Sequence, residues 1–184
     1  MTALSLLAKG GIHELTMRNI ADEIGVSEPA IYRHFSNKQE ILLQVLRAFQ
    51  AERKKEIEKI SSLDGDSFAR LHALWLGRLN DFSQNADLIP LIFSEEIFRS
   101  EKKIYSIIRA IMSQHENLVV MLIKSGQAAS QIRQDISAET LAFIFLSTLR
   151  SFILHWYRES QKFSLTGEGE ATYTAVQAML RRPV

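Results

Sequence analysis

The sequence has no cysteine among its 184 residues, only three prolines, and almost no excess of charge of either sign. Without cysteine, disulfide bonds, thiolate metal ligands and thiol catalysis are excluded together. The 22 lysine and arginine residues nearly balance the 21 aspartate and glutamate residues, which leaves a formal net charge of +1. Such a chain cannot adhere to nucleic acid through bulk charge, so any such contact must be made by a few placed residues.

A long apolar run is missing as well. The most apolar window, from Leu141 to Tyr157, is interrupted by Arg150 and His155, and it is shorter than the roughly 20 residues that span a bilayer. It predicts a helix buried in a soluble interface and no membrane partner. The start of the chain lacks the basic segment and apolar stretch of a secretory signal, which predicts a cytoplasmic protein.

Motifs of catalysis and cofactor binding are also missing. The five histidines are scattered, and none stands in the H-E-x-x-H or E-x-x-H spacing of a metal site. There is no phosphate-binding glycine loop and no G-x-S-x-G motif. Glu95 and Glu96 are adjacent, so their carboxylates would diverge by about 100° on a helix. We therefore predict no enzyme, and neither a metal nor a cofactor.

What the sequence does contain is helical periodicity. Apolar residues make up 46% and charged residues 23% of the chain, as in an ordinary globular protein. No segment alternates in the manner of a strand bounded by turns, so the chain is predicted to be all-α.

Turn and cap residues divide the expected helices. The clearest turn cluster, SSLDGD, covers residues 61–66. Beyond it, Asp87 is expected to cap a short segment opened by Pro90. A helix over residues 101–125 weakens at Gly126, and Ser137 or Asp135 caps the apolar helix. A turn at residues 166–167 then leads to a last helix over 168–182.

The stretch from Thr16 to Lys38, TMRNIADEIGVSEPAIYRHFSNK, predicts two short helices joined by a tight turn. Thr16 is a candidate N-cap, and Gly25 stands where a chain leaves a helix through a left-handed residue. Val26 can fold back on the first helix as the hydrophobic contact of that ending. Because Ser27 can cap the next helix at once, the turn is only about three residues long, which matches a helix-turn-helix.

The second of these helices has an inward and an outward side. At about 100° per residue, Ile31 and Phe35 face the first helix, whereas Pro29 and Arg33 point away from it. Tyr32 flanks the outward side. An aromatic hydroxyl and a guanidinium on such a face are suited to the major groove of DNA.

The run from Ala3 to Leu46 resembles the N-terminal domain of the TetR family of transcriptional regulators. The shared pattern is a first helix ending in glycine, then T-x-R-x-I-A, G-V-S, x-Y-x-H-F and K-x-x-x-L. With the turn cluster, the resemblance implies a helix-turn-helix domain at 1–46, a linking helix and loop at 47–65, and a helical ligand-binding and dimerisation domain at 66–184. It implies DNA contacts from Arg18, Ser27, Glu28, Pro29, Ala30, Tyr32, Arg33, His34 and Lys38.

The resemblance further implies a homodimer that binds a near-palindromic operator in double-stranded DNA and responds to a small, largely apolar effector. Effector candidates are apolar, aromatic and histidine side chains on different expected helices: His72, Trp75, Phe98, Tyr105, Met112, His115, Phe152 and Trp156. Dimer candidates lie on the last two helices: Phe143, Leu146, Ser147, Arg150, Leu154, Val176, Met179 and Leu180.

Two other functions stay open on the sequence alone. One is a helical protein-interaction module that does not bind DNA. The other is an all-helical enzyme, which would need a metal or cofactor that none of the spacings supports.

Overall fold

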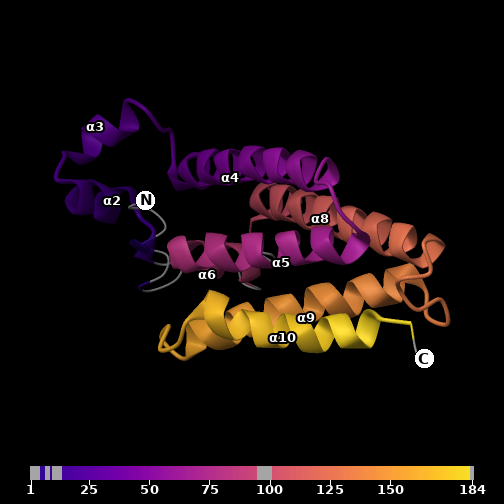
Figure 1. Cartoon of the computed structure of the whole chain (residues 1–184). Helices are drawn as coiled ribbons and strands as arrows, with labels where there is room; N and C mark the ends of the chain where they lie inside the picture. Colours follow the sequence, from indigo (N-terminus) through magenta and orange to yellow (C-terminus); the bar gives the residue numbers. More distant parts are fainter. Residues whose placement is uncertain (1–4, 7–8, 10–13, 95–100, 183–184) are drawn as a thin grey trace. The chain divides into compact units, whose positions relative to one another are not determined.

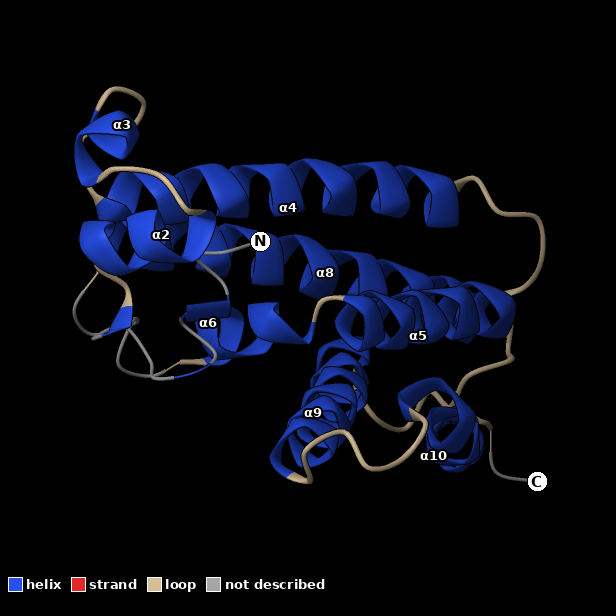
Figure 2. Cartoon of the chain, turned by 90° about the vertical axis from the view of Figure 1, so that its left-hand side faces the viewer, coloured by secondary structure: helices blue, strands red, loops and turns tan. Residues whose placement is uncertain are grey.

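The computed structural model describes residues 5, 6, 9, 14–94 and 101–182 (Figure 1). Every regular element within these residues is a helix, apart from one isolated antiparallel bridge between Ile132 and Arg181 (Figure 2). The prediction of an all-α fold is confirmed. The elements are α2 (Met17–Ile24), α3 (Glu28–Tyr32), α4 (Lys38–Ser61), α5 (Ser67–Gln84), the 3-10 turn η1 (Ala86–Leu88), α6 (Ile89–Phe93), α8 (Lys102–Ala128), α9 (Ala138–Arg158) and α10 (Leu165–Leu180). The helix expected ahead of Gly10 lies mostly outside the described residues.

The chain divides into two compact units. Unit 1 comprises Met1–Arg53 and Asn85–Ile111, and unit 2 comprises Lys54–Gln84 and Met112–Val184. Two of the three boundaries fall inside long helices, because α4 and α8 each run without a break from one unit into the other, and the third follows the end of α5. The division into domains at residues 46 and 65 remains a prediction.

Unit 1 surrounds a core drawn from distant parts of the chain. Leu15, Leu42 and Leu46 of the N-terminal region are almost fully buried, as are Leu91 of α6 and Ile104 of α8. The helix-turn-helix therefore shares one unit with residues 85–111.

Unit 2 is built around α5, whose apolar face packs on α10 and α9. Trp75 is fully buried, and its ring meets Phe145 edge to face at 5.4 Å between centroids. Its indole N–H donates to the carbonyl of Gly169 at 3.0 Å. A Cβ added at Gly169 would overlap the side chain of Leu79. The missing side chain is what lets α10 approach α5 so closely.

Several local predictions of helix ends are wrong. Helix α8 continues past Gly126 to Ala128. Gly126 makes room for Ile132, whose Cδ1 would lie 2.6 Å from an added Cβ. Helix α10 starts at Leu165 rather than 168, since the Ser164 hydroxyl accepts the backbone N–H of residue 167 and caps the helix there.

The caps proposed farther along the chain have mixed outcomes. Asp87 lies inside η1 and does not cap α6, which follows directly with Leu88 at its N-cap position. Ser137 does cap α9, accepting the Thr140 N–H at 3.1 Å. Asp135 instead binds Arg133.

Helix α9 is longer than the apolar window suggested. Its 21 residues, with a mean hydropathy of 1.2 in the most apolar stretch, are by length and composition enough to cross a membrane, and 33% of that stretch is buried. The core helix of a globular unit passes the same test. Phe145, Leu149 and Ile153 of this helix are buried within unit 2.

Candidate nucleic-acid interface and effector unit

Helix α2 begins and ends as its sequence predicts. The Thr16 hydroxyl accepts the Asn19 N–H at 3.0 Å, so the N-cap is confirmed. Gly25 has φ +77°, and its N–H donates to the Asp22 carbonyl at 3.2 Å while the Val26 N–H donates to the Ala21 carbonyl at 3.0 Å. These two bonds define the Schellman ending, which directs the chain into the turn.

The buried face of α2 does not extend into its last turn. Met17, Ile20 and Ala21 are buried, but Ile24, in the last turn, is 53% exposed. Val26 is also 42% exposed, so it covers the first helix only in part.

Helix α3 follows directly after Ser27, which occupies the N-cap position with an extended backbone. The expected side-chain cap is absent, because its hydroxyl accepts no N–H from the first turn. Ile31 points inward and is 7% exposed. Arg33 keeps helical dihedral angles, and the Phe35 N–H donates to the Ile31 carbonyl at 3.0 Å. The outward face predicted from the angular count therefore continues through Arg33.

The start of α4 is fixed by a reciprocal pair of bonds. The Asn37 side chain accepts the Glu40 N–H at 3.0 Å, and the Glu40 carboxylate accepts the Ser36 N–H at 2.7 Å. Asn37 is therefore the N-cap of α4. The bonds hold the short loop between α3 and α4, which carries His34, and so fix the approach to Lys38.

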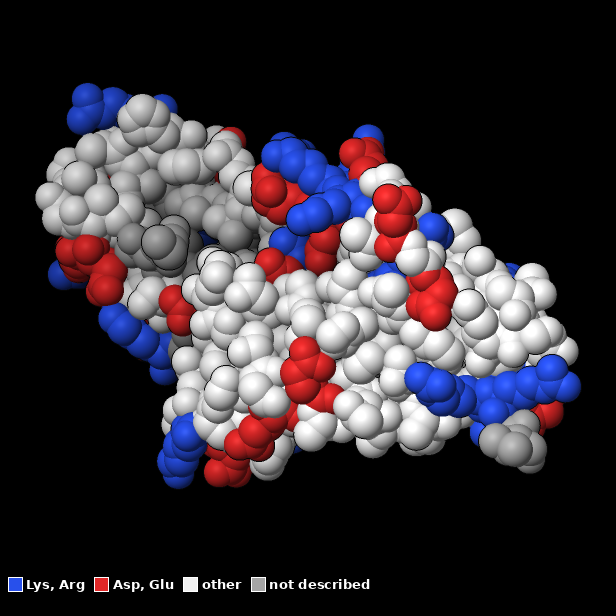
Figure 3. Space-filling model, viewed as in Figure 1, with Lys and Arg blue, Asp and Glu red and all other residues white. Residues whose placement is uncertain are grey.

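The residues predicted to contact DNA lie on α2, on α3, in the turns that flank α3 and at the start of α4, all in unit 1. Most are exposed, while Glu28, Ala30 and Lys38 are half-buried. The Arg18 side chain is 81% exposed and lies 3.9 Å from the Asp22 carboxylate, one turn away. Basic side chains project from the region of α3 in Figure 3. Individual DNA contacts remain predictions.

Sequence reasoning missed one polar contact beside this surface. The Gln39 amide, in the first turn of α4, donates to the Glu101 carboxylate at 2.6 Å. The two residues are 62 positions apart, and no local pattern links them. The contact joins the first turn of α4 to Glu101, the residue directly before α8.

Two groups of effector candidates come together in unit 2. His72 of α5 binds Glu170 of α10 at 2.8 Å and lies against Tyr173, with 4.6 Å between ring centroids. Burial, together with the carboxylates of Asp66 and Glu170, raises the pKa of Tyr173, whose hydroxyl donates to the carbonyl of residue 68 at 2.8 Å.

Phe152 and Trp156 of α9 form the second group, beside Phe163. The Phe152 and Phe163 rings are 6.0 Å apart, and the Trp156 indole donates to the Phe163 carbonyl at 2.9 Å.

Trp75 lies beside the first group, with 5.8 Å between its ring centroid and that of Tyr173, and the other effector candidates are placed apart from both groups. Trp75 lies in the core, Met112 and His115 are half-buried on α8, and Tyr105 belongs to unit 1 and is 38% exposed. Phe98 lies outside the described residues. Among the described residues, no group of three His, Cys, Asp or Glu side chains is arranged to hold a metal ion. The effector roles remain predictions.

The dimer candidates separate into exposed and buried side chains. Phe143 is 70% exposed and Met179 is 55% exposed. Leu146, Ser147 and Leu154 are half-buried, and Arg150 is exposed. Val176 and Leu180 are almost fully buried within unit 2, so they support α10 from inside. On α9, Phe143, Ser147, Arg150 and Leu154 fall on one stripe at helical spacing.

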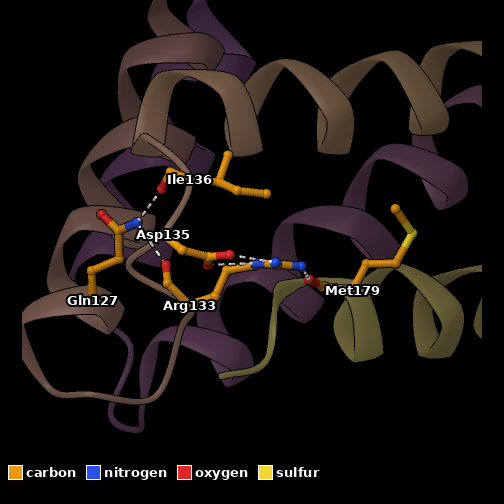
Figure 4. A network of polar contacts seen from close by, with 5 residues as sticks. All are labelled: Gln127, Arg133, Asp135, Ile136 and Met179. Atoms are coloured by element: carbon orange, nitrogen blue, oxygen red, sulfur yellow. Dashed lines mark hydrogen bonds and ion pairs between the residues drawn. The ribbon is translucent and has the colours of Figure 1, made fainter. Parts of the chain in front are cut away.

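A network of polar contacts holds the end of α10 against the loop between α8 and α9 (Figure 4). Arg133 binds the Asp135 carboxylate through two hydrogen bonds, at 2.8 and 2.6 Å, and reaches the Met179 carbonyl at 3.4 Å. Its backbone N–H donates to the Leu180 carbonyl at 2.9 Å. Gln127 donates to the carbonyls of Arg133 and Ile136. These bonds hold the end of α10, which carries the exposed Met179, in place.

The geometry agrees with comparisons to known proteins. Residues 2–45 match the family described as bacterial regulatory proteins, tetR family. The HTH-type transcriptional repressor KstR2 of Rhodococcus jostii is 25% identical over 156 residues, covering 85% of this chain and 76% of that protein. The fatty acid metabolism regulator protein of Bacillus subtilis is 19% identical over 163 residues, covering 89% and 84%.

Solved structures share the whole fold. The ketosteroid transcriptional regulator KstR2 of Mycobacterium tuberculosis superposes with a TM-score of 0.86 at 19% identity, covering 99% of this chain and 92% of that one. The regulator FadR of Bacillus subtilis, solved in complex with stearoyl-CoA, gives a TM-score of 0.80 at 17% identity, covering 98% and 96%. These relatives are described as transcriptional regulators, not enzymes.

Proposed function

We propose that this chain, which belongs to the TetR family of DNA-binding transcriptional regulators, is a cytoplasmic homodimeric repressor that leaves its operator when an effector binds. The observation that carries the proposal is the helix-turn-helix of unit 1. It combines a capped α2, a Schellman turn at Gly25 and an α3 whose outward side bears Tyr32 and Arg33. In a two-fold dimer, two such surfaces would meet successive major grooves, about 34–36 Å apart.

Within this surface, different residues serve affinity and specificity. The family resemblance assigns phosphate contacts to Tyr32, His34 and Lys38. Pro29 has no backbone donor, so readout at the start of α3 relies on apolar contact with thymine methyl groups. Arg33, on the outward face, is the side chain best suited to hydrogen-bond base edges, since arginine pairs with guanine in the major groove.

A salt titration separates the two roles. The probe is a labelled duplex from upstream of the protein's own coding region, titrated by fluorescence anisotropy at several salt concentrations. Lys38→Ala should weaken binding to all duplexes alike and lower the salt slope by about one unit, because one phosphate contact is lost. Arg33→Ala should also alter sequence preference. An unchanged slope for Lys38→Ala would refute its phosphate role, and no binding by the wild type would favour a protein-interaction module.

The dimer is proposed to form through the exposed stripe of α9 and the outer side of α10. Phe143 and Met179 are the largest exposed apolar side chains on these helices. Phe143→Glu and Met179→Glu should each shift the protein toward monomer in sedimentation velocity at micromolar concentration. Thr174→Glu is the matched control, because Thr174 is exposed on α10 but lies about 140° around it from Met179. A monomeric wild type would refute the dimer.

The effector is proposed to be a small, largely apolar molecule bound among the helices of unit 2. The aromatic groups around Tyr173 and Phe163 support this. One solved relative is in complex with stearoyl-CoA, whose acyl chain is apolar, and another is named a ketosteroid transcriptional regulator. Stearoyl-CoA and a ketosteroid should be tested for a thermal shift that coincides with release of the duplex. A compound that stabilises the protein without releasing DNA is not the effector.

A further inference from the structure

A buried ionic contact joins the last turns of α4 to α5, and neither DNA binding nor the effector site accounts for it. Arg78 of α5 is 8% exposed in its side chain, and its guanidinium pairs with Glu56 of α4 and, at 3.3 Å, with Asp81. The Glu56 side chain is itself only 18% exposed. Charged groups are rarely buried to this extent, and removing one partner of such a pair leaves the other uncompensated.

The neighbouring glycine leaves room for the Glu56 carboxylate. A Cβ added at Gly77 would collide with Oε1 of Glu56. Gly77 lies inside α5 with an ordinary backbone conformation, so no turn requires a glycine there, and glycine costs about 1 kcal/mol against alanine in a helix. The observation that accounts for this glycine is the room it leaves for the carboxylate. We call Gly77 and Arg78 the Glu56 seat.

Helix α4, which carries Glu56, also begins with Lys38, one of the residues predicted to contact DNA. Helix α4 is continuous over 24 residues, from Lys38 in unit 1 to Ser61 in unit 2. The rise of an α-helix puts about 27 Å of helix between Glu56 and Lys38. A tilt of about 5° at Glu56 would displace Lys38 by about 2 Å, which is enough to break a hydrogen bond to a phosphate.

We propose that Gly77 and Arg78 are positioning residues, which hold Glu56 and so fix the direction in which α4 carries the DNA-reading segment. The inference rests on the proposed function for its consequence at DNA. The orientation of α4 can be measured without DNA.

The first test measures that orientation directly. Because the chain has no cysteine, Glu23→Cys and Lys162→Cys accept spin labels at one site in each unit, with excess unlabelled protein to isolate distances within one chain. Glu56→Gln, which is nearly isosteric, and Gly77→Ala should shift or broaden the distance distribution by about 2 Å or more. Glu58→Gln, exposed on the same helix, should match the wild type. Unchanged distributions in both Glu56→Gln and Gly77→Ala would overturn the proposal.

The second test measures the consequence. In the anisotropy titration, Glu56→Gln and Gly77→Ala should each bind the upstream duplex about tenfold more weakly than the wild type, with the salt slope retained, since no phosphate contact is removed. A slope lowered as in Lys38→Ala, or equal losses in Glu58→Gln, would overturn the positioning role. If the wild type fails to bind the duplex, the proposed function fails, while the distance measurement still decides whether the seat orients α4.

Discussion

Substituting Gly169 by alanine tests whether close packing of α10 on α5 holds unit 2 together. A new Cβ would overlap Leu79 Cδ1 and lie 3.4 Å from Phe152 Cε1. Leu79 is fully buried, so it cannot move aside into solvent. Overpacking of this kind costs about 1–3 kcal/mol, whereas alanine is better than glycine in a helix by about 1 kcal/mol. Gly169→Ala should therefore lower the free energy of unfolding by up to about 2 kcal/mol.

Urea unfolding followed by tryptophan fluorescence is the assay, because both tryptophans of the chain, Trp75 and Trp156, lie in unit 2. Ala171→Gly, at an exposed position of α10, is the control that measures helix propensity alone. In a Leu79→Ala background the overlap disappears, and Gly169→Ala should become neutral or stabilising. The reasoning is refuted if Gly169→Ala stabilises the wild type by as much as Ala171→Gly destabilises it.

Two further predictions concern caps and charges. Thr16→Ala should destabilise unit 1 by about 0.5–2 kcal/mol in thermal unfolding, whereas Ser27→Ala should cost much less, because the Ser27 hydroxyl makes no cap bond; equal losses would contradict this. Hydrogen bonds from Arg133 lower the pKa of Asp135, so an NMR titration should find it below its ordinary value and rising toward that value in Arg133→Gln. The stabilisation from this pair is present above the ordinary pKa and is lost as pH falls through the lowered one.

The features that could be predicted from sequence are those set by neighbours along the chain. An N-cap is a bond across three residues, so Thr16, Asn37 and Ser137 could be identified from local pattern. The turn at Gly25 follows from the same local logic. Helix type and the inward position of Ile31 needed only periodicity.

Glycines inside helices could not be interpreted in this way. A glycine that ends a helix and a glycine that admits a neighbour look alike in sequence. Gly126 was predicted to weaken α8, but it makes room for Ile132. The uses of Gly77 and Gly169 depend on Glu56 and Leu79, which come from other helices.

The polar groups of the effector candidates could not be interpreted from the sequence either, because their hydrogen-bond partners are distant in the chain. Trp75 was selected because an aromatic residue stands on an apolar face, but its N–H partner is 94 residues away. The partner of His72 is 98 residues away. A pattern can therefore nominate a residue type for a binding site, while the long-range partner decides whether that residue faces a ligand or completes the core.

The two compact units divide the chain at other places than the family pattern does. The family pattern ends near residue 46, which suggests a reading domain connected by a linker to everything that follows. In the structure, residues 85–111 belong to the same compact unit as the helix-turn-helix, and Gln39 binds Glu101 within it. Helices α4 and α8 both leave this unit without a break. Because backbone hydrogen bonds run on through α4, the end of the family pattern near residue 46 marks no break in this helix.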